Sequence, residues 1–140
     1  MVNTKKLYKS WNETFDCPEF DEDMICDELE YIHEKGGHVL EFHTSGFFPE
    51  RWFDLVVLLR TDNSLLYDRL KARSYSEKKI TENIECEILE VTADECKESY
   101  KEEVIMELQS DKPEQVEANL SKVIEWVKQW VAQKKERGEL

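Results

Sequence analysis

The chain has 140 residues, of which 40% are hydrophobic and 36% are charged, and its formal net charge is −13 at pH 7. This length favours a single domain, and the apolar content is enough for a packed core. The acidic balance excludes direct, non-specific DNA binding, because phosphate contacts need Lys and Arg. No apolar run is long enough to cross a membrane and residues 1–6 carry no apolar signal segment, so we expect a nuclear or cytosolic protein.

The first recognisable element is a helix that follows residues 1–20, a stretch with no clear period. Acidic residues at 21–23 favour a helix N-terminus. Apolar residues at 25, 29 and 32 then recur at spacings of four and three, which places them on one helix face. Gly36 and Gly37 should end this helix, because glycine accepts the left-handed backbone of a helix cap.

Two strands are predicted next. Residues 38–43 (HVLEFH) read as a short strand, and residues 54–60 (DLVVLLR) form a near-continuous apolar run. Such a run is typical of a strand buried on both faces of a parallel sheet. The aromatic loop between them, residues 47–53, is interpreted as core packing, with base stacking as the alternative.

The second half of the chain is predicted to be mostly helical. Thr61 or Asp62 should cap a helix that reaches about residue 72. Residues 73–79 interrupt the apolar pattern with short polar turns, and a long helix is predicted over about 81–100. A last strand at 104–108 leads to a helix with Pro113 in its first turn.

The final helix carries an apolar stripe that we predict to be core. The stripe comprises Val116, Leu120, Val123, Val127 and Trp130, with Trp126 beside it. Helices intervene between most of the predicted strands, which favours an α/β sheet covered on both faces. The four cysteines show neither a C-x-x-C pair nor zinc-finger spacing, so reduced structural thiols are expected.

Glu41 and His43 form the first candidate site. They lie two residues apart at the C-terminal end of a predicted strand and would therefore face the same side. Open α/β sheets bind ligands at that end, and in P-loop enzymes an acid there holds Mg²⁺. A histidine titrating near neutrality can shuttle a proton or orient a water molecule. The alternative is an ordinary strand end with a solvated carboxylate and a structural histidine.

A cluster of cations forms the second candidate site. It comprises Arg60, Arg69, Arg73, Lys78 and Lys79. Cations on a helix and on the loop after it can clamp phosphoryl oxygens. The alternative is a solvated helix C-terminus, where the helix dipole favours positive charge.

Several stretches carry a specific resemblance to a known family. The segments FFPERWF, LRTDNSLLYDRL, YSEKK and NIECEI closely resemble the adenylate kinase isoenzyme 6 family, as does LYKSWNETFDCPEFDEDMICDELE. The resemblance covers about residues 7–131. It implies a P-loop NTPase-like, nucleoside-monophosphate-kinase-like α/β fold with a parallel sheet flanked by helices. It also implies phosphoryl transfer from ATP to AMP or dAMP, ATP hydrolysis with Mg²⁺, and a role with a small-subunit ribosomal protein in ribosome maturation.

Position by position, the resemblance assigns parts of one domain spanning 1–140. Residues 1–20 would be the monophosphate-binding arm, and residues 72–82 would be the lid over ATP. Arg73 would be the ATP-contacting arginine. We expect Arg69, Lys78 and Lys79 to act with Arg73 at the ATP site and its lid.

The resemblance also assigns the chemistry at the first candidate site. Glu41 matches the family's Walker-B-like acid and would support Mg²⁺ indirectly, and His43 matches the catalytic histidine. The chain departs from the family here, because the acid is usually Asp and because residues 44–46 (TSG) replace Gly-Cys-Asp.

The sequence contains no G-x-x-x-x-G-K-[ST] motif, which supplies the phosphate cradle of a P-loop site. By the resemblance, the first strand and this Walker A loop are expected to be absent, and that strand normally lies between 38–43 and 54–60. Those two segments would then pair directly or leave exposed edges. Three interpretations follow: an enzyme, a non-catalytic paralogue that binds a basic ribosomal protein, or a fragment of a longer protein.

Overall fold

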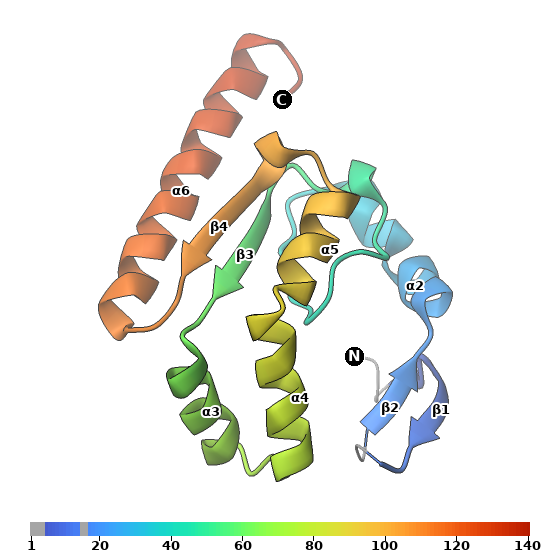
Figure 1. Ribbon diagram of the computed structural model, residues 1–140. Helices are drawn as coiled ribbons and strands as arrows, with labels where there is room; N and C mark the ends of the chain where they lie inside the picture. Colours follow the sequence, from blue (N-terminus) through green and yellow to red (C-terminus); the bar gives the residue numbers. More distant parts are fainter. Residues whose placement is uncertain (1–4, 15–16) are drawn as a thin grey trace.

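The computed structural model describes residues 5–14 and 17–140. Its elements are β1 (Tyr8–Asn12), β2 (Cys17–Phe20), α2 (Glu22–Lys35), β3 (Val56–Arg60), α3 (Asn63–Ala72), α4 (Glu77–Ile88), α5 (Val91–Ser99), β4 (Ile105–Gln109) and α6 (Pro113–Glu136). Two single 3₁₀ turns, Glu50–Trp52 and Glu102–Val104, precede β3 and β4. Figure 1 shows β3 and β4 side by side between α6 and α5, with the β1–β2 hairpin beyond α2.

The strands predicted at 54–60 and 104–108 are confirmed to within two residues. β3 and β4 pair in parallel, with a register that runs from Val56 opposite Ile105 to Arg60 opposite Gln109. Successive side chains of a strand point to opposite faces. Leu58 and Leu108 point to opposite faces of this pair, and both are buried. Val57 and Leu59 are 38% and 56% exposed, so the predicted burial of β3 on both faces is wrong. The predicted α/β class with a parallel sheet is nevertheless confirmed.

The strand predicted over 38–43 is wrong. This segment has neither helix nor strand, and Val39 is 96% exposed. A strand must pair its backbone N–H and C=O groups with a neighbour. Within the described residues β3 pairs with β4 alone, so no strand partner lies beside 38–43 and one edge of β3 stays open. The open edge, rather than direct pairing of the two segments, is the outcome that the structure shows.

The predicted helix ends at 21 and 36 and the predicted start at 62 are confirmed. Asp21 accepts a hydrogen bond from the backbone N–H of Met24 at 3.0 Å, and Asp62 accepts one from Ser64 at 2.9 Å. Gly36 follows the last turn of α2 with φ 63°, a backbone angle that favours glycine. Capping side chains at the two starts and the backbone freedom of glycine at the end therefore set these boundaries.

The single long helix predicted over 81–100 is instead two helices. Leu89 and Glu90 separate α4 from α5, and Glu90 adopts the left-handed conformation with φ 55°. Helix α4 also begins earlier than predicted, because Ser76 caps it by accepting from the backbone N–H of Lys79 at 3.3 Å. Lys78 and Lys79 therefore lie in the first turn of a helix and not in a polar loop.

An aromatic core joins the N-terminal half of the molecule. Its buried members are Leu7, Ile25, Leu29 and Phe48. Half-buried rings surround them, among them Phe20, Phe42, Phe47, Trp52 and Phe53. The interpretation of the 47–53 loop as core packing is confirmed. The β1–β2 hairpin, which had no signal in the sequence, contributes Phe20 to this core.

The predicted core stripe of α6 is largely wrong. Val116, Leu120 and Val127 are exposed, at 54%, 59% and 43%, and no residue of α6 is buried. Trp126 and Trp130 are half-buried, with ring centroids 6.3 Å apart. Helix α6 packs on β4, and this strand is too narrow to cover the whole apolar face of the helix.

The cysteines are unpaired, and Cys96 is buried in α5. None of the helices in the described part of the chain is both long and apolar enough to cross a membrane.

Candidate functional site

A cleft opens at the carboxyl end of the β3–β4 pair. Parallel strands end at the same edge of a sheet, and open α/β sheets bind ligands outside that edge. The cleft has a volume of about 420 Å³. Its lining comprises Arg60, Thr61, Asp62, Asn63, Glu87, Ile88, Glu90, Glu107 and Gln109.

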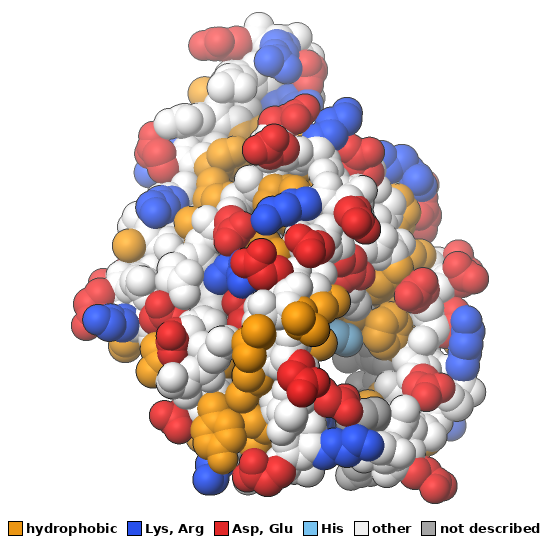
Figure 2. Space-filling model, viewed as in Figure 1, with side chains coloured by type: hydrophobic (Ala, Val, Ile, Leu, Met, Phe, Trp, Pro, Cys, Tyr) orange, Lys and Arg blue, Asp and Glu red, His pale blue; other side chains and the backbone are white. Residues whose placement is uncertain are grey.

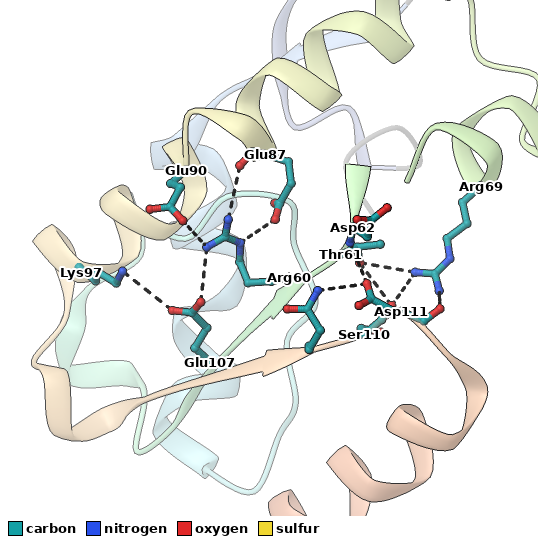
Figure 3. A network of polar contacts seen from close by, with 11 residues as sticks. Arg60, Thr61, Asp62, Arg69, Glu87, Glu90, Lys97, Glu107, Ser110 and Asp111 are labelled. Atoms are coloured by element: carbon teal, nitrogen blue, oxygen red, sulfur yellow. Dashed lines mark hydrogen bonds and ion pairs between the residues drawn. The ribbon is translucent and has the colours of Figure 1, made fainter. Parts of the chain in front are cut away.

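Arg60, the last residue of β3, is held by three carboxylates (Figure 3). Its Nε donates to Glu87 Oε1 at 2.6 Å, and its Nη1 donates to Glu90 Oε1 at 3.0 Å and to Glu107 Oε1 at 3.4 Å. The hydrogen bond to Glu87 is the main cause that raises the pKa of Arg60. This guanidinium therefore ties the end of α4 and the turn before α5 to the sheet and is already neutralised by protein groups.

Arg69 joins helix α3 to the loop between β4 and α6. Its two terminal nitrogens donate to the backbone oxygens of Ser110 and Asp111, both at 2.7 Å (Figure 3). The carboxylate of Asp111 in turn accepts from the backbone N–H of Asp62 at 2.7 Å. The loops that follow β3 and β4 are thus fixed to each other, and Arg69 shapes this side of the cleft.

The α3–α4 turn carries the remaining predicted cations. Figure 1 shows α3 and α4 extending past the carboxyl ends of β3 and β4 to this turn. Arg73 and Lys78 are exposed, and Lys79 is half-buried with its Nζ 4.5 Å from the ring centroid of Tyr75. Ser74 has φ 60°, which lets the chain reverse between the two helices. Arg73 and Lys78 thus present positive charge to solvent beyond the sheet end.

Glu41 and His43 lie in the irregular segment after α2. Because this segment is not a strand, the argument that the two side chains share a face does not hold. Glu41 is exposed. The His43 ring lies 4.6 Å from the Phe42 ring and 5.5 Å from the Phe20 ring, and the residue is exposed.

The environment of His43 favours its neutral imidazole. Loss of solvent beside the aromatic rings lowers its pKa below the ordinary value of 6.5, and the charge of Glu95 opposes this shift. A neutral imidazole is able to accept a proton. The lowered pKa of His43 therefore favours the form that a base requires.

Glu95 is a site residue that the sequence did not reveal. Its Oε1 accepts from Thr44 Oγ1 at 2.5 Å and from the backbone N–H of Gly46 at 3.2 Å. It stands among several acids in a helical stretch, so no local pattern distinguishes it. The contact depends on a fold that brings α5 against the loop after His43.

The predicted residues thus form two groups. Arg69, Arg73, Lys78 and Lys79 lie on the α3–α4 hairpin at the sheet end. Glu41 and His43 lie on the loop that contacts α5, and no group of three or more His, Cys, Asp or Glu arranged to hold a metal occurs in residues 5–14 and 17–140.

Comparison with known proteins agrees with this fold. Residues 1–90 match the family described as an AAA domain. The chain is 46% identical over 129 residues to the adenylate kinase isoenzyme 6 homolog of Dictyostelium discoideum, covering 92% of this chain and 74% of that protein. The homolog of Drosophila melanogaster is 40% identical over 130 residues, with 93% and 74% covered. The homolog of Caenorhabditis elegans is 44% identical over 126 residues, with 89% and 69% covered. The chain therefore belongs to the adenylate kinase isoenzyme 6 family, whose P-loop NTPase-like α/β fold its parallel strand pair and flanking helices share.

Proposed function

We propose that the chain binds ATP beyond the carboxyl ends of β3 and β4 and acts as a nucleoside-monophosphate kinase and ATPase, with AMP or dAMP as acceptor. The supporting observation is the parallel strand end, where the loops fixed by Arg69 meet a hairpin that presents cations. Family membership supports the same assignment. Phosphoryl transfer depends mainly on positioning and on charge stabilisation, which such a group supplies.

Each predicted residue has a role in this proposal. Arg73, Lys78 and Lys79 would bind the phosphate oxygens of ATP. Arg69 would keep the cleft wall in place through its backbone contacts. His43 would accept the proton of the attacking hydroxyl or water, a role that its lowered pKa favours.

Mg²⁺ would enter with ATP. Protein sites for Mg²⁺ commonly use one or two carboxylates together with phosphate oxygens and water, and the exposed carboxylate of Glu41 fits such a role. When bound, the ion would neutralise charge on the phosphate oxygens.

Equilibrium binding of Mg²⁺–ATP, measured by calorimetry, tests the proposal without requiring turnover. Arg73→Gln should weaken binding about tenfold, since a charge-assisted contact contributes roughly 1.5 kcal/mol or more. Lys128→Gln on α6 removes one charge far along the chain and serves as the matched control. No measurable binding by the native chain, or equal affinity in both variants, would contradict the proposal.

Turnover is a separate measurement. A coupled assay with ATP and AMP or dAMP should show product formation above the buffer background. ATP binding without turnover would leave a nucleotide-binding protein and would remove the kinase part of the proposal.

The acidic surface favours a second function, in the nucleus or cytoplasm. Figure 2 shows Asp and Glu side chains spread over the face that carries α4 and α5, and the formal net charge is −13. Charge of this sign attracts basic proteins. The chain would bind a basic small-subunit ribosomal protein, with an affinity that falls steeply between about 50 and 300 mM salt. Affinity that does not change with salt would exclude this electrostatic mode.

A further inference from the structure

Helix α6 carries an exposed strip of apolar side chains. The strip comprises Val116, Leu120, Ile124 and Val127. Spacings of four, four and three residues place these side chains on one side of the helix, and they are between 43% and 59% exposed. Figure 1 shows α6 along the outer edge of the molecule, with its C-terminal turns extending past β4. The exposed strip is therefore accessible to another chain.

Two opposite charges border the exposed strip on one flank. Glu117 and Lys128 lie seven residues before and four residues after Ile124, so both are beside it on the helix surface. They are eleven residues apart, close to three helical turns, and therefore lie on the same line along the helix. Both are exposed, and neither forms an ion pair with any residue in 5–14 or 17–140.

An antiparallel second copy of the chain complements these charges. Glu117 and Lys128 lie equally far before and after the midpoint between residues 122 and 123. A two-fold axis through that midpoint, perpendicular to both helices, brings Glu117 level with Lys128 of the second copy on the same flank. Because such an interface uses the same surface on both copies, the reverse ion pair forms at its other end.

The same register packs the apolar side chains against each other. Val127 of the second copy lies level with the space between Val116 and Leu120, as a side chain enters the hole of a coiled-coil interface. The two Ile124 residues lie on either side of the two-fold axis, about 4.5 Å apart along the helix direction. Antiparallel helices also place opposite ends of their dipoles side by side.

We infer that two copies of this chain associate through α6, with the exposed strips packed antiparallel and two Glu117–Lys128 ion pairs across the interface. A membrane surface fits this face poorly, because anionic lipids repel a chain of net charge −13. A basic protein is attracted by clustered acids, whereas one charge of each sign borders the exposed strip. The association does not depend on the proposed nucleotide binding.

The dimer should be weak. The exposed strip extends about 16 Å along the helix, and small interfaces are typical of transient complexes. Two copies that each carry a net charge of −13 also repel each other, although salt at about 150 mM screens this repulsion beyond about 8 Å. We expect a dissociation constant on the order of 100 μM. At the low micromolar concentrations of a denaturation experiment the chain is then monomeric, and Leu120 is exposed.

Sedimentation equilibrium of the full chain tests the inference. In salt at about 150 mM, the average mass should rise from that of one chain towards that of two between about 10 μM and about 1 mM protein. Leu120→Gln should abolish this rise, because it places a polar side chain in the packed strip. Circular dichroism of each variant checks that the helices are retained.

Charge exchange tests the register. Glu117→Lys and Lys128→Glu each turn two attractive pairs into two repulsive ones and should raise the dissociation constant about tenfold or more. The double variant restores both pairs with inverted polarity and should return to within about threefold of the native value. The exchange leaves the proposed ATP-binding cations unchanged.

Glu125→Lys is the matched control for Glu117→Lys. Glu125 is exposed on α6 away from the exposed strip, and its substitution changes the net charge by the same amount. Both substitutions reduce the overall repulsion between copies, so Glu125→Lys should not weaken the dimer, whereas Glu117→Lys should. A single-chain mass at about 1 mM protein would overturn the inference and leave the exposed strip to a different partner. Equal association by the native chain and Glu117→Lys, or a double variant no better than either single one, would also overturn it.

Discussion

Arg60 and Glu87 form a largely buried ion pair, with Nε and Oε1 separated by 2.6 Å and with side chains only 16% and 20% exposed. The pair joins the last residue of β3 to the last turn of α4. The two strands of the sheet are far apart in sequence, whereas the helices of the α3–α4 hairpin are neighbours. The ion pair is a contact that holds this hairpin against the sheet.

Removing the Arg60 charge should destabilise the fold. Arg60→Gln leaves Glu87, Glu90 and Glu107 facing one another without a cation, and loss of one partner of a largely buried pair costs about 2–4 kcal/mol. Urea denaturation followed by tryptophan fluorescence measures the change in the free energy of unfolding.

Arg51→Gln is the matched control for that measurement. Arg51 pairs with Glu30 at 3.3 Å, and the two side chains are 66% and 47% exposed. An exposed pair contributes less than about 1 kcal/mol. Equal losses in the two variants would show that the Arg60 cluster does not hold α4 and α5 to the sheet.

The parts of the fold that were predictable from sequence depend on local chemistry. The helix starts near 21 and 62 were predictable from their acidic and capping residues, and in the structure Asp21 and Asp62 accept from the backbone two or three residues ahead. The apolar run at 54–60 indicated a parallel strand from its composition alone, but Val57 and Leu59 are 38% and 56% exposed. The cation cluster was visible as a pattern, but its division into a structural Arg60 and an exposed Arg73 was not.

The parts that were missed depend on distant partners. Residues 38–43 read as a strand from their composition, but no strand of the described part of the chain lies beside them to pair with. The break at Glu90 interrupts an apolar period that continues on both sides, so the period alone predicted one helix. Glu95 meets Thr44 across 51 positions of sequence, and neither residue carries a local signal of that contact.

Arg69 should be needed for the cleft wall. Arg69→Ala removes two hydrogen bonds of 2.7 Å to the backbone oxygens of Ser110 and Asp111, and should cost about 2–3 kcal/mol of unfolding free energy. Arg69→Lys keeps the charge but loses the planar fork, so it should recover less than half of that loss. Full recovery by Lys would show that charge alone matters. Thermal unfolding of the three proteins under one buffer condition provides the comparison.

The two sides of α6 should respond differently to polar substitution. Leu120 is 59% exposed, so Leu120→Gln should change the free energy of unfolding by no more than about 0.5 kcal/mol. Trp126 is half-buried and lies beside Trp130, so Trp126→Ala should cost about 2 kcal/mol or more. A large loss on Leu120→Gln would show that the exposed stripe is covered in solution. Chemical denaturation at two protein concentrations would then reveal whether self-association covers it.

Tyr100 should make the fold sensitive to alkaline pH. Burial of its ring raises the pKa of Tyr100 from 10.0 to about 12, and its hydroxyl donates to two backbone oxygens. The unfolded chain releases this proton near pH 10, before the folded chain does. The contribution is therefore complete below about pH 10 and is lost as the pH rises towards 12.

Tyr100→Phe should flatten that dependence. Comparing urea denaturation at about pH 9 and pH 11.5, the native chain should lose roughly 2 kcal/mol more than the variant, because the two pKa values differ by about two units. At neutral pH the variant should be less stable by about 1–2 kcal/mol, since Ser45 and Phe48 lose a buried donor. Tyr31→Phe alters a ring that is 52% exposed and should follow the native pH dependence. Parallel curves for the native chain and Tyr100→Phe would mean that the Tyr100 hydroxyl titrates as it does in water, and that helix α5 does not enclose the loop after His43.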